Sequence, residues 1–257
     1  ASPFGFSSWL AEGEALGSFR AYRVDKIFQT QAEIDALNEA ARGRYGAAAV
    51  YQAALTRPGD IKFVDINGDG RITADDQEIQ GSAQPTFFGG FRNNLTYKGF
   101  DLDIFFQFVQ GNKMLNYTRV FSEGMNGVFG QTDAVLNRWT PTNTNTDVPR
   151  AVWGDPNNNR RNSDRFIEDG SYARLKNLTF GYTLPRSIVN KLKIDKLRVY
   201  FTGQNVLTFT KYKGMDPEVS AFSQGNNGNT TANAAPGTDF LTFPQPRTFI
   251  VGVNIGF

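Results

Sequence analysis

The chain has 257 residues, a formal net charge of +2 at neutral pH, and neither cysteine nor histidine. This composition excludes disulfide bonds, thiolate or imidazole metal sites and catalytic triads built on histidine or cysteine, and the small net charge gives no reason to expect a nucleic-acid partner. Aromatic residues make up 14% of the chain, with 23 phenylalanines, which is typical of many aromatic strands joined by polar loops.

The N-terminal part of the chain is predicted to hold one strand and one helix. The first ten residues contain no methionine and no signal peptide, so we expect the chain to be a piece of a longer or processed protein. Residues 17–28 have the composition of a strand. Residues 31–42 place Ile34, Leu37 and Ala41 on one face of a short helix.

A long connection from residue 29 to residue 86 contains the stretch DINGDGRITADD, which follows the pattern of a twelve-residue calcium loop. Calcium prefers six to eight oxygen ligands, and such a loop supplies them from alternate positions. Gly70 stands where the chain must turn sharply. Counted from the first aspartate, the expected ligands are Asp65, Asn67, Asp69, the backbone carbonyl of Arg71, Thr73 and Asp76.

The flanks of this loop, residues 65–76, differ from those of a calcium sensor. The upstream sequence RPGDIKFV is a Pro-Gly break followed by β-prone residues, and not a helix. A turn rich in Asn, Asp and Gly would give a similar sequence without any metal. If calcium binds here, we therefore expect a structural ion that braces a long loop, and not a switch.

Residues 87–97 and 100–109 are predicted to form a hairpin, because only Lys98 and Gly99 separate two strand-like segments. Ten residues are the length that a tilted strand needs to cross a membrane. The second strand alternates strictly, which suits a wall between lipid and water. One face carries Phe100, Leu102, Ile104, Phe106 and Phe108, and the other carries Asp101, Asp103, Phe105 and Gln107.

Further strands are predicted at 172–183, 197–210 and the C-terminal RTFIVGVNIGF, with others at 114–121 and 165–169. In the C-terminal segment every second residue from Phe249 to Phe257 is apolar. An unprotected strand of this kind would aggregate in water, whereas a barrel protects it by pairing it with a neighbour.

The connections between these strands alternate in length. Residues 29–86, 110–171 and 211–246 are long, whereas 98–99 and 184–196 are short. Outer-membrane barrels have short periplasmic turns and long extracellular loops. The sequence therefore predicts an all-β fold, an antiparallel transmembrane β-barrel with long extracellular loops, in which 29–86 is an extracellular excursion that contains the calcium-like loop.

Some side chains are candidates for contact with a ligand. Trp139 and Trp153 lie in an Asn-rich region and would either stack on sugar rings or anchor their loop, and we favour the second role. Asp101 and Asp103 would line the barrel interior. No acid or base partner for them is identifiable, so no catalytic residue and no enzyme activity are predicted.

The stretch NNNRRNSDR could bind an anion through Arg160, Arg161 and Arg165, but we interpret it as a solvated loop. In the segment 211–219, KYKGMDPEV, we expect a fixed turn in which Pro217 sets the backbone.

Several of these segments together resemble the C-terminal part of SusC/RagA-like TonB-dependent transporters of the Gram-negative outer membrane. They cover most of residues 16–257, in the order of that family. Departures occur at Arg20, Arg23 and Lys26, near a segment where the family has GYxxDGIF. The matching segments are LGSFRAYRVDKIFQTQAEIDAL, PGDIKFVDINGDGRITADDQEIQGSAQPTFFGGF, YKGFDLDIFFQFVQGN, FIEDGSYARLKNLTFGYTLP, LRVYFTGQNVLTFTKYKGMDPEV and RTFIVGVNIGF.

The resemblance implies a location in the outer membrane and import of a large nutrient, a glycan or a peptide, through a plugged barrel. Residues 1–257 would be the C-terminal portion of that barrel, and the plug and the N-terminal barrel strands would lie outside this chain. The implied partners are the remaining barrel and plug, outer-membrane lipid, a SusD-like surface lipoprotein as a lid, and TonB through the missing N-terminal part.

The alternative interpretation is a secreted, calcium-braced β-sandwich that binds or cleaves glycans. A sandwich would need protected edges and one water-compatible face on each strand. The apolar terminal strand and the alternating lengths of the connections argue against it.

Overall fold

The computed structural model describes residues 8–218 and 236–257 and divides them into two compact units. Each unit is built from three stretches of chain. Within the described residues, the first unit comprises 8–84, 113–168 and 236–242, and the second comprises 85–112, 169–218 and 243–257.

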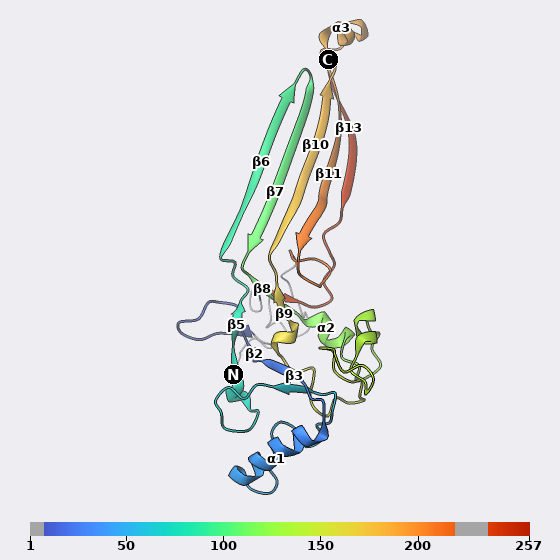
Figure 1. The fold of residues 1–257 in the computed structure, drawn as a ribbon. Helices are drawn as coiled ribbons and strands as arrows, with labels where there is room; N and C mark the ends of the chain where they lie inside the picture. The colour runs from blue at the N-terminus through green and yellow to red at the C-terminus, as the bar shows by residue number, and fades with distance from the viewer. Residues whose placement is uncertain (1–7, 219–235) are drawn as a thin grey trace, which may run out of the picture. The chain divides into compact units, whose positions relative to one another are not determined.

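The second unit is a five-stranded sheet with the order β13-β11-β10-β7-β6, in which every neighbouring pair is antiparallel. Figure 1 shows these long strands running alongside one another. Among the described residues the sheet is open, since β13 and β6 are its two edges. The strands are β6 (Phe87–Tyr97), β7 (Phe100–Gln110), β10 (Tyr172–Thr183), β11 (Lys196–Thr210) and β13 (Thr248–Gly256).

The predicted hairpin is confirmed, with Tyr97 opposite Phe100 at its closed end. Its two turn residues both have left-handed backbones, with φ of 48° at Lys98 and 89° at Gly99. Two residues of positive φ make the turn whose twist matches that of the flanking strands.

Strand β10 contains an irregularity that its sequence encodes. The apolar residues fall at Ala173 and Leu175, and then at Leu178 and Phe180, so the alternation changes phase between them. The register against both neighbouring strands shifts at this place, between Leu175 and Asn177. The extra residue returns Leu178 to the same face as Leu175.

The first unit contains three small sheets. Their orders are β1-β2-β5, β3-β4 and β12-β8-β9, and the pair β12-β8 is parallel. The strands are β1 (Ser8–Trp9), β2 (Ser18–Tyr22), β3 (Val24–Ile27), β4 (Ile61–Phe63), β5 (Gln77–Ser82), β8 (Lys113–Asn116), β9 (Ile167–Asp169) and β12 (Thr238–Asp239).

Three strand predictions in this part of the chain are wrong in part. The predicted strand 165–169 begins within the 3-10 turn Asp164–Phe166, and only Ile167–Asp169 is a strand. Residues 17–28 form two strands that belong to different sheets and are separated at Arg23. The segment 114–121 begins as β8 and then continues as α2 (Tyr117–Ser122). Asn116 ends the strand and caps the helix, because its side chain accepts a hydrogen bond from the N–H of Arg119.

Helix α1 (Gln31–Tyr45) confirms the predicted helix and extends it. Thr30 caps its N-terminus by accepting from the N–H of Glu33. Ile34 packs with Phe28 and Tyr51, while Ile27, Ile61 and Phe63 form a neighbouring core cluster. The remaining short helices are α3 (Arg186–Val189) and the 3-10 turns at Ala74–Asp76, Asp133–Asn137, Asp164–Phe166 and Asn190–Leu192. None of the helices described here has the length and apolar character needed to cross a membrane.

Candidate functional site: a sheet with an apolar and a charged face

One face of the five-stranded sheet is apolar across all of its strands. Residues opposite one another in an antiparallel pair share a face, and the register aligns Leu95, Leu102, Phe180, Phe201 and Val251 in one row. This face is not covered by other parts of the described chain. Its exposed side chains include Phe91, Leu95, Tyr97, Phe100, Phe180, Val199, Phe201, Phe249, Val251, Val253 and Ile255.

The opposite face carries ion pairs between neighbouring strands. The Asp103 carboxylate on β7 accepts hydrogen bonds from Nε and a terminal nitrogen of Arg92 at 2.9 and 2.7 Å, and from the Asn94 amide at 2.6 Å. Asp103 is only 9% exposed. A buried carboxylate is tolerated here because these donors replace its hydration.

Asp101 pairs with Arg198 across an intervening strand. The two guanidinium–carboxylate contacts measure 2.9 and 2.5 Å. In the register, Gly181 of β10 is opposite Asp101 on β7 and Tyr200 on β11, and Arg198 is two residues before Tyr200 on the same face. A Cβ at Gly181 would stand 2.5 Å from a guanidinium nitrogen of Arg198 and 2.6 Å from the carboxylate oxygens of Asp101, so a larger residue would have to push the ends of both side chains aside.

These contacts assign both predicted aspartates to the charged face. Asp101 and Asp103 are each bonded to an arginine, and they are not arranged as a free acid and base. The face was predicted from the alternation, whereas the arginine partners were not, because only the strand register brings them to the carboxylates.

A third ion-pair cluster, which the sequence did not reveal, holds the segment after β11 against this sheet. Arg174 is 3% exposed and bonds to Asp216 and Glu218, each at 2.5 Å. Lys176 also contacts Glu218. The second carboxylate oxygen of Asp216 accepts from the N–H of Gln245 at 2.8 Å. The predicted fixed turn is therefore fixed by charge as well as by Pro217.

The pKa of Asp216 reflects this environment. Burial alone would raise the pKa of its carboxyl group, but the hydrogen bonds from Arg174 and from the N–H groups of Glu218 and Gln245 outweigh burial and hold that pKa below its usual range.

In the first unit, the calcium-like loop has the predicted sharp turn, with φ of 87° at Gly70. One Asp65 oxygen accepts from the N–H groups of Gly68 and Asp69, and the other accepts from that of Gly70, at 2.7 to 3.1 Å. Asp76 is fully buried. Its two oxygens accept from the N–H groups of Ile66 and Thr73, and Thr73 and Asp76 form a capping box.

The donor set of this loop suits a hard cation, because carboxylate and amide oxygens retain lone pairs beyond these N–H bonds. Asn67 and Asp69 lie exposed or half-buried beside Asp65, and the Arg71 N–H is bonded to Asp69. Within residues 8–218 and 236–257, however, no three Asp, Glu, His or Cys side chains converge as a metal site. Calcium at Asp65, Asn67, Asp69, Arg71, Thr73 and Asp76 stays a prediction.

The two candidate tryptophans differ in their surroundings. Trp139 packs on the Ile27–Ile61–Phe63 cluster, lies against Gly59 and donates from its indole N–H to Gln29 at 3.0 Å. Trp153 is 74% exposed. The anchoring role fits Trp139, and only Trp153 is free to meet a ligand.

The arginines of NNNRRNSDR are not on a solvated loop as interpreted from the sequence. Arg161 lies over the ring of Phe63 at 4.4 Å, and Arg165 is buried and bonded to Glu123 at 3.1 Å. Arg160 pairs with Asp155. The polar character of the stretch concealed these tertiary contacts.

Comparison with known proteins identifies the relatives of this chain. No family model matches it. TonB-dependent receptor P3 of Formosa agariphila is 40% identical over 248 residues, which are 96% of this chain and 23% of that receptor. TonB-dependent receptor P26 of the same organism is 34% identical over 258 aligned positions, covering 96% and 23% of the two chains. TonB-dependent receptor SusC of Bacteroides thetaiotaomicron is 28% identical over 240 residues, covering 91% and 21%.

The fold is also similar to a solved transporter. The RagAB peptide transporter superposes with a TM-score of 0.67 and 26% identity, over 99% of this chain and 25% of that chain. This chain thus spans about a quarter of the length of the proteins that it matches. Over nearly its whole length it is homologous to TonB-dependent receptors of the SusC and RagA kind, as its sequence motifs predicted.

Proposed function

We propose that this chain forms barrel strands and extracellular loops of an outer-membrane transporter that imports a large nutrient, a glycan or a peptide, with energy from TonB. The observation that carries the proposal is the five-stranded sheet with an exposed apolar face and a face of ion pairs. Lipid would cover the first face, and a water-filled interior would meet the second.

Strand length supports this assignment. The hairpin strands β6 and β7 each have 11 residues, which is enough to cross the hydrocarbon layer at a tilt. Further strands would pair with the open edges of β6 and β13 and close the barrel, because unpaired backbone groups are not tolerated in lipid.

The alternative, a secreted sandwich, is less consistent with the apolar face. A sandwich buries the inner face of each sheet against a second sheet, whereas Phe249 and Val251 are 61% and 76% exposed. A lipid environment accounts for these exposures without a second sheet.

The partners follow from the same proposal. A SusD-like lipoprotein would cover the extracellular loops, and TonB would act through a part of the transporter outside this chain. The RagAB relative is a peptide transporter, and SusC is a TonB-dependent receptor, so both support import without selecting between peptide and glycan.

The test of this proposal is fractionation of the source cells, followed by electrophoresis of the protein with and without boiling. We expect an outer-membrane band that is much larger than 28.5 kDa and shifts on heating, because folded barrels resist detergent. A soluble band of this mass that is indifferent to boiling would contradict the proposal and favour the sandwich.

We also propose that a structural calcium ion braces the loop at residues 65–76. Terbium reports on such a site, because the Tyr45 hydroxyl donates to the Asp69 carbonyl at 2.9 Å and a tyrosine this close sensitises terbium luminescence. We expect luminescence that calcium quenches and that Asp65→Asn removes. The matched control is Asp75→Asn, an exposed neighbour outside the ligand set. Equal luminescence in the two variants would contradict a calcium site.

A further inference from the structure

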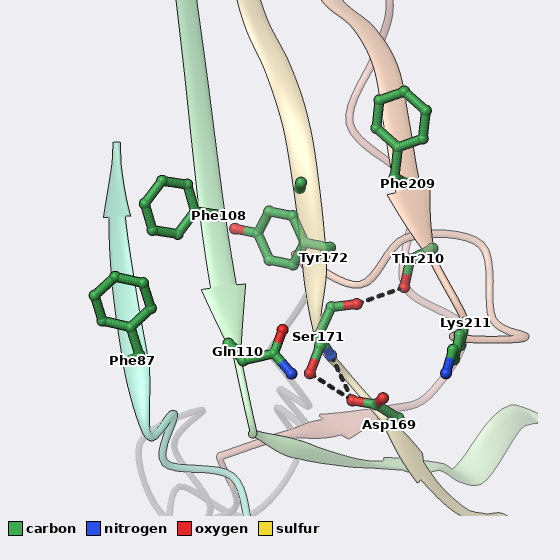
Figure 2. A pocket seen from close by; sticks show the side chains of 10 residues that line it. Phe87, Phe108, Gln110, Asp169, Ser171, Tyr172, Phe209, Thr210 and Lys211 are labelled. Carbon is green, nitrogen blue, oxygen red and sulfur yellow. Dashed lines mark hydrogen bonds between the residues drawn. The ribbon is translucent and has the colours of Figure 1, made fainter. Parts of the chain in front are cut away.

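A cavity of about 550 Å³ opens at the end of the sheet where β7 and β11 finish and β6 and β10 begin (Figure 2). It lies wholly within the second unit. The residues around it are Phe87, Phe108, Gln110, Asp169, Ser171, Tyr172, Ala173, Phe209, Thr210 and Lys211.

A small side chain between two large ones creates the apolar part of this cavity. Ala173 on β10 is the cross-strand partner of both Phe108 on β7 and Phe209 on β11. The two outer strands are roughly 10 Å apart, twice the usual spacing between strands. The methyl group of Ala173 therefore forms the floor of a slot between two phenylalanines, which we call the Ala173 slot.

The Ala173 slot belongs to the exposed apolar face of the sheet. Phe87 extends one wall, because its ring stacks on Phe108 with centroids 5.3 Å apart. Further along the strands, the next residues on this face are Leu175 and Leu207, which lie outside the lining of the cavity. Phe209 is 60% exposed. The slot is thus a short apolar depression that opens onto the exposed face of the sheet.

The mouth of the slot is polar, but most of its polar groups are already bonded. Ser171 donates from its hydroxyl to Asp169 at 2.5 Å and accepts from the N–H of Gly111 at 2.9 Å. The Thr210 hydroxyl donates to the Ser171 carbonyl at 2.8 Å. These bonds, drawn in part in Figure 2, leave few groups to recognise a sugar.

Lys211 differs from these bonded polar groups. Its side chain is exposed, and its ammonium group has no hydrogen-bond or ion-pair partner in the described part of the chain. It follows directly after the end of β11. A lysine at the edge of an apolar surface places its charge where lipid headgroups lie.

We propose that the Ala173 slot binds a membrane lipid that carries phosphate, with one acyl chain between Phe108 and Phe209 and the phosphate group beside Lys211. This inference rests on the proposed function, which places the apolar face in lipid. The two recognition elements are independent. The slot packs against the acyl chain of the lipid, and the lysine selects an anionic headgroup.

The test is native mass spectrometry of the full-length protein in detergent, titrated with dimyristoylphosphatidylglycerol. We expect Ala173→Phe, which fills the slot, and Lys211→Gln, which removes the charge, each to weaken binding by about tenfold. The matched controls are Val251→Phe, on the same face but on β13, and Lys98→Gln, in the turn between β6 and β7. Both controls should bind the lipid as the unmodified protein does.

Equal binding by Ala173→Phe and Val251→Phe would overturn the proposal, as would equal binding by Lys211→Gln and Lys98→Gln. The heat-shifted band verifies that each variant is folded, and Lys211→Gln changes only an exposed side chain. If all variants lie in the outer membrane and bind lipid alike, the lipid site fails and the transporter assignment stands. If the unmodified protein is soluble, the transporter assignment itself fails.

Discussion

At the scale of single residues, the central feature is the glycine that lets an ion pair cross a strand. Arg198 reaches Asp101 across β10 over Gly181, which places no side chain between them. The alternation of the sequence predicted that Asp101 faces the interior. It did not predict that Arg198, which is 97 residues away, would pair with Asp101. Only the register of three strands brings two residues so distant in sequence together.

We expect Gly181→Ala to displace the ends of this pair and to lower the free energy of unfolding by about 1 kcal/mol or less, because the Cβ meets only the flexible ends of two partly exposed side chains. Urea titration of the full-length protein in detergent measures the loss. The control is Gly127→Ala, at a glycine with open space around it. A Gly181→Ala variant as stable as this control would show that the pair does not contribute.

At the scale of elements, the regular strands were predictable and the connections were not. Residues 87–97 and 172–183 form strands with the predicted bounds, because aromatic and apolar residues recur along each segment and turn-forming residues bound it. At the break at Arg23, the N–H groups of Tyr22 and Val24 donate to Asn162 and Asp164, far away in the sequence. The helix after Asn116 begins at the local cap that this residue provides. The sequence around the break and around this helix carries no periodic signal of either.

The anchor of the segment 211–218 gives this element a dependence on pH. The pKa of Asp216 is lowered in the folded state, so its contribution is complete above the unfolded value of about 3.9 and is lost as the pH falls through the folded value. We expect the protection of amides in residues 211–218, measured relative to their intrinsic exchange rate at each pH, to fall only below about pH 4 in the unmodified protein. Asp216→Asn should lower this protection at neutral pH.

Hydrogen exchange measured by mass spectrometry tests this expectation. Residues 186–195, which do not contact the anchor, serve as the internal control. If Asp216→Asn leaves exchange in the segment unchanged at neutral pH, the ion pairs with Arg174 do not hold it in place.

At the scale of the whole molecule, the proposed orientation of the sheet in a membrane distinguishes two adjacent residues. Leu95 lies on the apolar face, and Thr96 lies on the charged face opposite Asp101. Both residues are exposed. In a water-soluble sheet an arginine would be tolerated at either position, whereas in a barrel wall only Thr96 meets water.

We expect Leu95→Arg to destabilise the protein by about 1–3 kcal/mol or to prevent its insertion, because Leu95 lies between the middle of β6 and the turn, and Thr96→Arg to change stability by less than about 1 kcal/mol. The fraction of heat-shifted protein in the outer membrane, followed by urea titration, measures both variants. Equal tolerance of the two arginines would place the apolar face outside lipid.

The glycine between Asp101 and Arg198 also limits the order in which this protein can change during evolution. A larger residue at position 181 would push the two charged side chains apart, so it is favoured where this ion pair is absent. Descendants should therefore either keep all three residues or replace all three. The three positions are expected to vary together among homologues, although they lie on three different strands.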